Sequence, residues 1–406
     1  MSELKVVSLE GCLEKVIDYR GRTPKKLGKD WLKDGEYRAI SANNVKFDGL
    51  IREESIYRGD EELYKLWMKE EVEKGDILLT SEAPSGQAMI WDSDEKIILS
   101  QRLYALRVNK NLVDNNYLKY FIQSPLGQKS ITRNNSGSTV SGISAKTFKN
   151  IKILIPDLKK QLEISKILLN IDQKIQINNQ INQELEAMAK TLYDYWFVQF
   201  DFPDQNGKPY KSSGGKMVYN PELKREIPER WGVEELGDVA YLKAGGDKPS
   251  NISEIQSKET PFPIYSNGLD NKGLYGYTNK ATIHKKSLTV SARGTIGYVQ
   301  RRFSSFFPII RLISVTPKEE KMIGYIENFL KSIQFENSGS VQRQLTVPQI
   351  DKLYILVPKN EVLKKYHSMT VNYYSEVENN EQQNQELTQL RDWLLPMLMN
   401  GQVKVE

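Results

Sequence analysis

The chain has one cysteine and two histidines, and these shortages exclude several classes of site. A lone Cys12 cannot form a disulfide within the chain, which fits a reducing compartment, and one thiol is too few for a structural zinc site. We interpret Cys12 as a core residue. His284 and His367 are too isolated in the sequence to indicate a metal site or a catalytic triad.

Sequence signals for membrane insertion and for export are also missing. No window approaches the roughly 20 apolar residues that a membrane-spanning helix needs, and the start lacks the basic-then-apolar layout of a signal peptide. We therefore expect a cytoplasmic protein without a membrane partner. The 406 residues suffice for two or more folded domains, and the net charge of +5 is compatible with nucleic acid without establishing it.

Catalytic motifs are missing as well. A DNA adenine methylase should carry an Asn-Pro-Pro-aromatic motif, but Asn220-Pro221-Glu222 lacks the second proline and the aromatic residue, and there is no glycine-rich cofactor loop. A phosphate-cradling Gly-x-x-x-x-Gly-Lys-Ser/Thr loop is also absent. The carboxylates near Asp94 and at Asp157 come in the wrong order for a nuclease. We expect no catalytic residue, no metal and no cofactor in this chain.

An internal duplication is the most informative feature that is present. Residues 136–156 read SGSTVSGISAKTFKNIKILIP and residues 338–358 read SGSVQRQLTVPQIDKLYILVP, at a constant offset of 202 between Ser136 and Ser338 and between Pro156 and Pro358. Earlier segments match more loosely, such as 75–86 with 286–297 and 102–103 with 311–312. Short alternating apolar runs at 77–80, 97–99, 103–108, 151–155 and 288–291 predict strands. The chain therefore contains two divergent copies of one β-rich domain.

Each copy continues into a long segment with a helical period. Asp157 is a natural helix N-cap, and apolar residues then recur at alternating spacings of four and three, with asparagines in phase, which is a heptad seam. The simpler interpretation is that each helix packs on its own domain. The matching seams instead favour two long helices that pack antiparallel on each other, with buried Asn side chains fixing their register. The predicted seam comprises Ile164, Leu168, Ile171, Ile175, Asn178, Asn182, Leu185 and Leu192 in the first helix, and Tyr366, Tyr373, Val377, Asn380, Asn384, Leu387 and Leu394 in the second.

These patterns predict an α+β protein in which two β-rich domains, in a pseudo-twofold arrangement, are separated by two long antiparallel coiled-coil helices. The Gly-, Ser- and Lys-rich stretch between the copies reads as an exposed linker. The predicted boundaries are 1–156 for the first domain, 157–200 for the first helical region, 201–227 for the linker, 228–358 for the second domain and 359–406 for the second helical region.

Several motifs in this order resemble the specificity subunits of type I restriction-modification systems. Residues 227–231 (IPERW) followed by 236–239 (LGDV) look like the opening of a target recognition domain, and 291–297 (SARGTIG) resembles a strand and turn of such a domain. Residues 192–202 (LYDYWFVQFDF) and 390–402 (LRDWLLPMLMNGQ) resemble the ends of the family's two helical regions. The first domain departs more, with Glu82-Ala-Pro-Ser-Gly86 where the second has Arg293.

The resemblance implies a non-catalytic specificity subunit that addresses its partners to DNA. Each domain would read one half of a bipartite duplex site in the major groove, and the helices would set the distance between the halves. Two modification subunits, which bind S-adenosylmethionine and methylate adenine, would dock on the chain, and two restriction (motor-nuclease) subunits would join for cleavage.

Candidate DNA contacts follow from side-chain chemistry, because Arg and Lys suit guanine or phosphate and Asn and Gln suit adenine. A single Lys or Arg is more often a solvated surface charge, so groups of such residues in loops carry the prediction. The set is Arg22, Lys25, Lys26, Asn43, Asn44, Ser85, Gln87, Asn134, Asn135 and Ser136 in the first domain, and Lys248, Asn267, Arg293, Thr295, Arg301, Arg302, Gln342, Arg343 and Gln344 in the second.

Two other functions remain open at this point. A coiled-coil assembly scaffold that binds no DNA is the main alternative, and Arg- and Asn/Gln-rich loops in both copies argue against it. A self-contained nuclease or methylase is disfavoured by the missing motifs.

Overall fold

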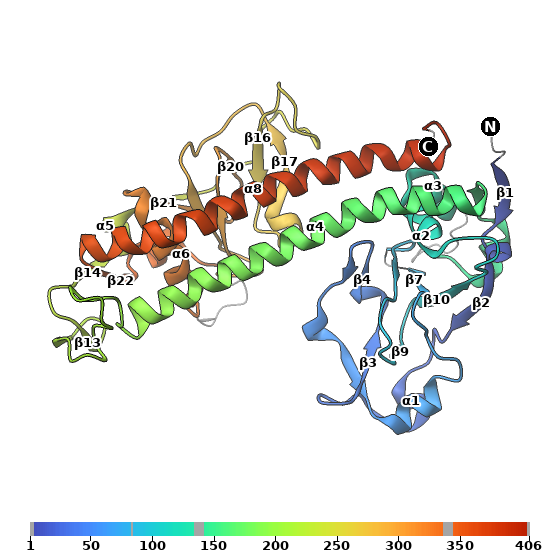
Figure 1. The fold of residues 1–406 in the computed structure, drawn as a ribbon, viewed down its shortest axis with the longest axis horizontal. Coiled ribbons are helices and arrows are strands. Elements are labelled where there is room, and N and C mark those ends of the chain that lie inside the picture. Colours follow the sequence, from blue (N-terminus) through green and yellow to red (C-terminus); the bar gives the residue numbers. More distant parts are fainter. Residues whose placement is uncertain (1–3, 83, 134–141, 336–343, 404–406) are drawn as a thin grey trace. The chain divides into compact units, whose positions relative to one another are not determined.

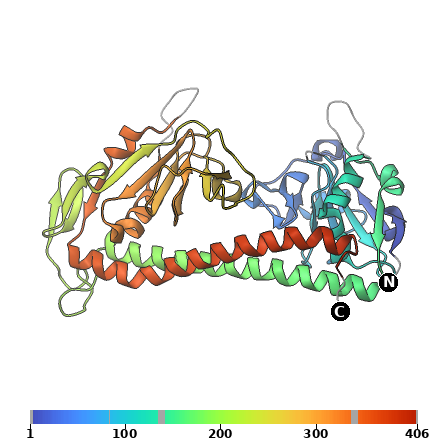
Figure 2. The same cartoon turned by 90° about the horizontal axis from the view of Figure 1, so that it is seen from above.

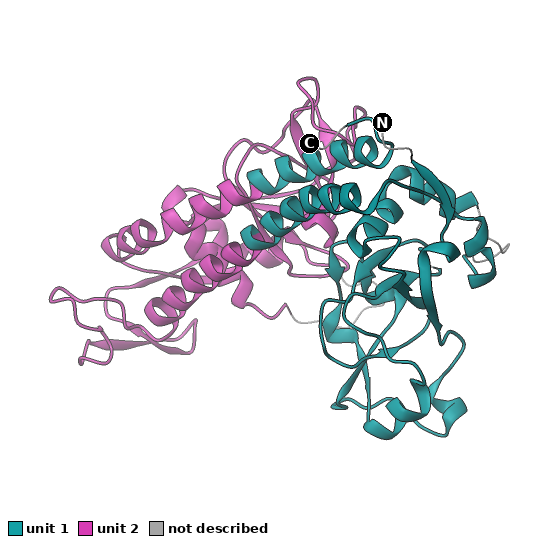
Figure 3. Ribbon diagram, turned by 45° about the vertical axis from the view of Figure 1, so that its right-hand side comes forward, with its two compact units in different colours: residues 1–178, 382–406 teal, residues 179–381 magenta. Residues whose placement is uncertain are grey.

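The computed structural model describes residues 4–82, 84–133, 142–335 and 344–403. The chain divides into two compact units, one formed by residues 1–178 and 382–406 and the other by residues 179–381 (Figure 3). We call them unit 1 and unit 2. Two long helices, α4 (Leu158–Tyr193) and α8 (Asn360–Met399), each contribute one part to unit 1 and one part to unit 2.

Unit 1 is built on small, mostly antiparallel sheets. A four-stranded sheet has the order β2-β10-β7-β8, and a three-stranded sheet has the order β6-β3-β9 with β3 and β9 parallel. Pairs β1-β11 and β4-β5 complete the strands. The bounds are β1 Lys5–Ser8, β2 Leu13–Asp18, β3 Tyr37–Ile40, β4 Val45–Lys46, β5 Gly49–Leu50, β6 Tyr57–Gly59, α1 Glu61–Trp67, β7 Ile77–Thr80, β8 Ala88–Ile90, β9 Ile98–Leu99, β10 Leu103–Val108, α2 Asn115–Gln123, α3 Pro125–Arg133 and β11 Lys152–Ile155.

Unit 2 repeats this topology, which confirms the duplication. Its four-stranded sheet is β15-β21-β18-β19, its three-stranded sheet is β17-β16-β20 with β16 and β20 parallel, and β14 pairs with β22. A separate hairpin, β12-β13, lies in the segment that follows α4 (Figure 1). The bounds are β12 Met217–Asn220, β13 Arg225–Pro228, β14 Gly232–Glu235, α5 Leu236–Val239, β15 Ala240–Ala244, β16 Phe262–Tyr265, β17 Leu274–Thr278, β18 Ser287–Ser291, β19 Val299–Arg302, β20 Phe307–Pro308, β21 Leu312–Pro317, α6 Ile323–Ser332, α7 Val347–Asp351 and β22 Tyr354–Val357.

Helices α2 and α6 occupy equivalent positions in the two units. The Tyr117 hydroxyl donates to the Leu154 carbonyl at 2.7 Å, and the Tyr325 hydroxyl donates to the Leu356 carbonyl at 2.5 Å. Leu154 and Leu356 are themselves 202 residues apart, the offset of the duplication. The register of α2 on its unit therefore matches the register of α6, so that Lys119 corresponds to Glu327.

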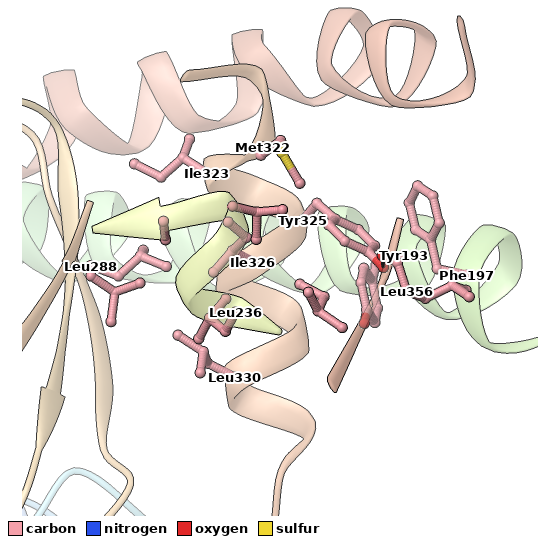
Figure 4. Close-up of a cluster of buried hydrophobic side chains, with 14 of the residues drawn as sticks. Tyr193, Phe197, Leu236, Leu288, Met322, Ile323, Tyr325, Ile326, Leu330 and Leu356 are labelled. Carbon is pink, nitrogen blue, oxygen red and sulfur yellow. Dashed lines mark hydrogen bonds between the residues drawn. The ribbon is translucent and has the colours of Figure 1, made fainter. Parts of the chain in front are cut away.

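Two sequence motifs, residues 192–202 and 227–231, contribute aromatic side chains to the core of unit 2. Phe197, from the π-helical turn Asp194–Val198 after α4, lies with its ring centroid 4.7 Å from that of Tyr325 and 6.0 Å from that of Trp231. Trp231 also stacks on Phe202 at 4.8 Å. Figure 4 shows Tyr193 and Phe197 beside Tyr325 and the aliphatic side chains of α6. The aromatic run 192–202 and the segment 227–231 thus form one hydrophobic core, to which each aromatic pair adds about 0.5–1.5 kcal/mol.

Helix α4 begins where its cap predicts. The Asp157 carboxylate accepts the backbone N–H of Lys160 at 3.0 Å, as expected of an N-cap. The α-helix runs to Tyr193, since no Pro or Gly interrupts it, and one π-helical turn continues to Val198, short of the predicted end at residue 200. Helix α8 tolerates Pro396 within its last turns.

Within each unit, the local parts of α4 and α8 lie side by side and run antiparallel (Figures 1 and 2). In unit 1, Ile164 and Leu168 of α4 share a hydrophobic cluster with Leu395 and Leu398 of α8. In unit 2, the Tyr366 hydroxyl of α8 donates to the Ala189 carbonyl of α4 at 3.3 Å. Every predicted seam residue is buried or half-buried.

The seam asparagines bond across the helix pair. In unit 1 the Asn178 amide donates to the side-chain oxygens of Asn384 and Gln383, both at 2.8 Å. In unit 2 the Asn380 amide donates to the Asn182 side-chain oxygen at 2.9 Å. Such bonds satisfy amides that would be costly to bury alone, and they exist only in one register.

No described helix is both long enough and apolar enough to cross a membrane.

Candidate nucleic-acid interface

The loop between β7 and β8 in unit 1 holds two of the predicted DNA contacts, Ser85 and Gln87. The Thr80 hydroxyl fastens this loop, because it donates to the Pro84 carbonyl at 2.7 Å and accepts the Gln87 N–H at 2.9 Å. Gly86 adopts a φ of 87°, which a residue with a side chain reaches only with strain. Ser85 and Gln87 are half-buried on this fastened loop.

The loop between β18 and β19 is its counterpart in unit 2. The N–H of Gly297 donates to the Ser291 carbonyl at 2.9 Å, just as the N–H of Gly86 donates to the Thr80 carbonyl at 2.9 Å. This loop carries Arg293, half-buried, and Thr295, exposed.

Asn267 joins a second predicted segment to the β18–β19 loop. Its side-chain amide donates to the Arg293 carbonyl at 2.8 Å, so these two predicted contacts lie next to each other. The corresponding loop positions in the two units carry Glu82 and Arg293, and they therefore differ in charge.

Unit 1 has a cavity of about 160 Å³ beside the loop that follows β3. Asn43 and Asn44 line it together with Trp31, Tyr57, Gln101 and Arg102, among others. Trp31 and Tyr57 stack with ring centroids 5.8 Å apart on one part of this wall. The cavity thus combines amide and guanidinium groups with aromatic faces, which is a set suited to a nucleic acid.

Other predicted DNA contacts have hydrogen-bond partners inside the chain. The Arg22 guanidinium donates to the Trp67 carbonyl at 2.5 Å, and the Asn44 side chain, only 3% exposed, accepts from the Ser41 N–H at 3.1 Å.

The two arginines at the end of β19 are bound in the same way. Arg301 donates to the Glu327 carboxylate at 2.7 Å, and Arg302, 5% exposed, donates to the Thr289 hydroxyl at 3.0 Å and stacks on Tyr265. Because the side chains of Asn44, Arg301 and Arg302 are buried against partners of this chain, these three are structural residues, and the DNA-contact prediction for them is corrected accordingly. Arg22 is half-buried, and its DNA contact stays a prediction.

The remaining predicted residues divide between the surface and the undescribed part of the chain. Lys25, Lys26, Asn43, Lys248 and Gln344 are exposed. Lys26 reaches the Gly21 carbonyl at 2.8 Å, and the Lys248 ammonium lies 4.3 Å from the centroid of the Tyr275 ring. Asn134, Asn135, Ser136, Gln342 and Arg343 lie outside the described residues.

Sequence reasoning missed two exposed turns. Gln101 and Arg102 precede β10, and Ile310 and Arg311 precede β21 at the equivalent place. Arg102 and Arg311 both have a positive φ, of 60° and 74°. The pairing of 102–103 with 311–312 was visible in the sequence, but a positive φ at arginine has no sequence signal.

Nucleophilic and metal chemistry find little support in the described residues. Cys12 is fully buried, and burial raises the pKa of its thiol to about 11, so that it stays protonated at neutral pH. Across residues 4–82, 84–133, 142–335 and 344–403, no group of three or more His, Cys, Asp or Glu side chains could hold a metal ion.

Comparison with known proteins gives one consistent result. The family model for the type I restriction modification DNA specificity domain matches residues 1–187 and 228–389. The specificity subunit of type I restriction enzyme MjaIX from Methanocaldococcus jannaschii is 26% identical over 351 residues, which cover 82% of this chain and 78% of that protein. The specificity subunit of type I restriction enzyme HindI from Haemophilus influenzae is 24% identical over 413 residues, covering 82% and 88%.

A solved structure agrees in fold. The S subunit of a type I restriction-modification system from M. genitalium aligns with a TM-score of 0.55 and 15% identity, over 98% of this chain and 96% of that chain.

Proposed function

This chain belongs to the type I restriction-modification DNA specificity subunits, and we propose that it reads a bipartite duplex target, one half-site with each unit. The single observation that carries the proposal is the repeated loop surface. Each unit presents the loop between its third and fourth sheet strands (β7–β8 or β18–β19) beside an exposed turn that bears an arginine. Two such surfaces on one chain suit a target that is read in two parts.

Phosphate contacts give this proposal a direct test. Binding to duplex DNA should weaken linearly in log K against log salt, with a slope of about −0.9 per phosphate contacted. A scaffold that binds only proteins would show no such slope with random duplex. Measuring affinity at several salt concentrations therefore separates the DNA-reading function from the coiled-coil scaffold.

Genome-wide mapping of adenine methylation tests the bipartite target. A strain that carries the gene should show one methylated motif made of two half-sites and a spacer, and the motif should vanish when the gene is deleted. Methylation that persists in the deletion strain, or a motif without a spacer, would refute the assignment of one half-site to each unit.

We assign the chemistry to partner subunits. Two modification subunits would bind S-adenosylmethionine and methylate adenine, and two restriction subunits would join them for cleavage. This chain would recognise the DNA target sequence. Exposed apolar side chains support a docking site on the helices: Trp393 is 58% exposed and Leu390 is 43% exposed, both within the segment 390–402.

Substitution tests this docking site. Trp393→Ala with Leu390→Ala should weaken copurification with the modification subunit and leave duplex binding unchanged. Exposed Tyr219, on the hairpin β12-β13, offers a matched control, since Tyr219→Ala also removes an exposed aromatic side chain. Equal capture of the modification subunit by both variants would exclude this surface.

A further inference from the structure

The turns that precede β10 and β21 share a backbone that is unusual for arginine. Arg102 has a φ of 60° and Arg311 a φ of 74°, in the left-handed region that residues with long side chains rarely adopt. In each case the arginine carbonyl accepts a backbone N–H from the adjacent loop at 2.9 Å, from Ser81 in unit 1 and from Ala292 in unit 2. Arginine stands at this point of both divergent copies, although glycine would adopt the conformation without strain, and this motivates a role for the side chain.

Both arginine side chains are available at the surface. Arg102 and Arg311 are exposed, and the side chain of Arg102 keeps 52% of its accessible area. Its Nε lies 3.4 Å from the Glu82 carboxylate, which steers it toward the β7–β8 loop. A guanidinium in this position, beside a loop of candidate base contacts, suits a DNA phosphate.

The residue before each arginine differs in a way that matches the chemistry of bases. Gln101 is exposed and is one of the residues that line the cavity of unit 1. Ile310, at the same place in unit 2, is 49% exposed. A side-chain amide makes paired hydrogen bonds to adenine in the major groove, whereas an apolar side chain contacts the methyl group of thymine.

We propose that Gln101 and Ile310 each read one base pair of the half-site of their own unit, and that Arg102 and Arg311 hold a neighbouring phosphate. Gln101 recognises adenine, and Ile310 recognises a thymine methyl group. This inference rests on the proposed function, because it assigns individual base pairs of the half-sites to residues within the same two DNA-reading surfaces.

The base-reading part is tested with the full chain in complex with its modification subunit, by sequencing the methylated sites. Gln101→Ala should relax one adenine position in one half-site, and Ile310→Gln should change the preference at one thymine position in the other. Duplex affinity for the original site should fall about 5- to 150-fold for each. Gln205→Ala, an exposed glutamine in the segment between the duplicated copies, is the matched control and should leave every letter unchanged.

The phosphate part is tested by glycine substitution, because glycine adopts a positive φ without strain and so preserves the turn. Arg102→Gly and Arg311→Gly should leave thermal stability equal or higher, keep all letters of the motif, and lower the salt slope by about one each. Arg230→Gly removes an exposed arginine with a φ of 69° that follows β13, and it should leave the salt slope unchanged.

The outcomes distinguish this inference from the proposed function. If the wild-type complex methylates a bipartite motif, but Gln101→Ala and Ile310→Gln change neither half-site, the base-reading assignment is wrong while the proposed function stands. An unchanged salt slope in both glycine variants would overturn the phosphate assignment. A wild-type chain without salt-dependent duplex binding would refute the proposed function, and this inference with it.

Discussion

Glu327 is the residue whose neutralisation should destabilise unit 2 most clearly. Its carboxylate, 5% exposed, accepts from Arg301 of β19 at 2.7 Å and from Lys331 of α6 at 2.8 Å. The Arg301 guanidinium also lies 3.3 Å from the centroid of the Tyr374 ring of α8. The cluster therefore joins the sheet, α6 and the helix pair within unit 2.

The magnitude follows from what Glu327→Gln leaves behind. The substitution keeps the shape of the side chain but leaves Arg301, 8% exposed, without its counter-charge, and breaking such a buried pair costs about 3–5 kcal/mol. Lys331 keeps Glu186 as a partner at 3.3 Å, and Arg301 keeps the face of Tyr374, so we expect about 3 kcal/mol.

Hydrogen exchange by segment is the suitable assay, since a protein of two units need not unfold in one step. Amides of α6 and of residues 360–381 should exchange faster in Glu327→Gln, while α2 of unit 1 stays unchanged. The control is Glu61→Gln on α1, where the Glu61–Lys65 pair is exposed on both sides, at 62% and 70%. Exchange in α6 as slow as in this control would refute the argument.

The same cluster predicts a dependence on pH. Burial by itself would raise the pKa of the Glu327 carboxyl, but the charges of Arg301 and Lys331 outweigh it and hold that pKa below its usual value. A depressed carboxyl pKa stabilises the fold above the unfolded pKa, and the stabilisation is lost as pH falls through the folded pKa. Exchange protection of α6 should therefore drop on acidification below about pH 4.5 in the wild type, and less steeply in Glu327→Gln.

Three further predictions concern the helix pair. Ile171→Asp with Ile175→Asp places charges in the seam and should cost several kcal/mol, so intact α4 protection by hydrogen exchange would show that these side chains do not pack on α8. Asn182→Leu with Asn380→Leu should raise the melting temperature but allow the two helices to pair in more than one register. Cysteines introduced on the two helices would then give additional cross-linked species. A single cross-linked species would show that the amides do not specify the register. Inserting one heptad at facing points of α4 and α8 keeps the seam in phase and lengthens the helix pair by about 10 Å. The spacer of the methylated motif should then grow by about one to three base pairs while the half-sites stay unchanged. An unchanged spacer with normal methylation would show that the helices do not set the distance between the half-sites.

The sequence predicted the elements that depend on local pattern and repetition. The strands at 77–80 and 103–108 match β7 and β10 because alternation and flanking turn residues define them locally. Asp157 caps α4 as expected. Asn178 of α4 and Asn384 of α8 were predicted to lie in the seam, and they bond to each other because the heptad phase places each of them on the face of its helix that packs on the other helix.

The failures concern properties that depend on distant partners. Arg301 and Arg302 look like surface cations in the sequence, but their partners Glu327 and Lys272 come from α6 and from the segment before β17. Burial of a charge is decided by such tertiary contacts, which a periodic pattern does not encode. The left-handed turns at Arg102 and Arg311 were missed for the same reason, since the fold imposes a conformation that the local residue disfavours.

Helices α2 and α6 carry side chains of opposite charge at equivalent positions, and this bears on the exchange of the two domains by recombination. At equivalent positions, Lys119 of unit 1 faces Asp172 of α4 at 3.5 Å, while Glu327 of unit 2 faces Arg301 and lies in the same cluster as Tyr374 of α8. Asp172 and Tyr374 are themselves 202 residues apart. A recombination event that moved the second domain into the first position would place Glu327, with its partners Arg301 and Lys331, where Lys119 now stands, so Asp172 would lose the Lys119 ammonium and, among the described residues, keep only Arg391 as a basic partner. The ion pair between Lys119 and Asp172 therefore ties the first recognition domain to its own part of α4, and exchanging the two domains would remove it.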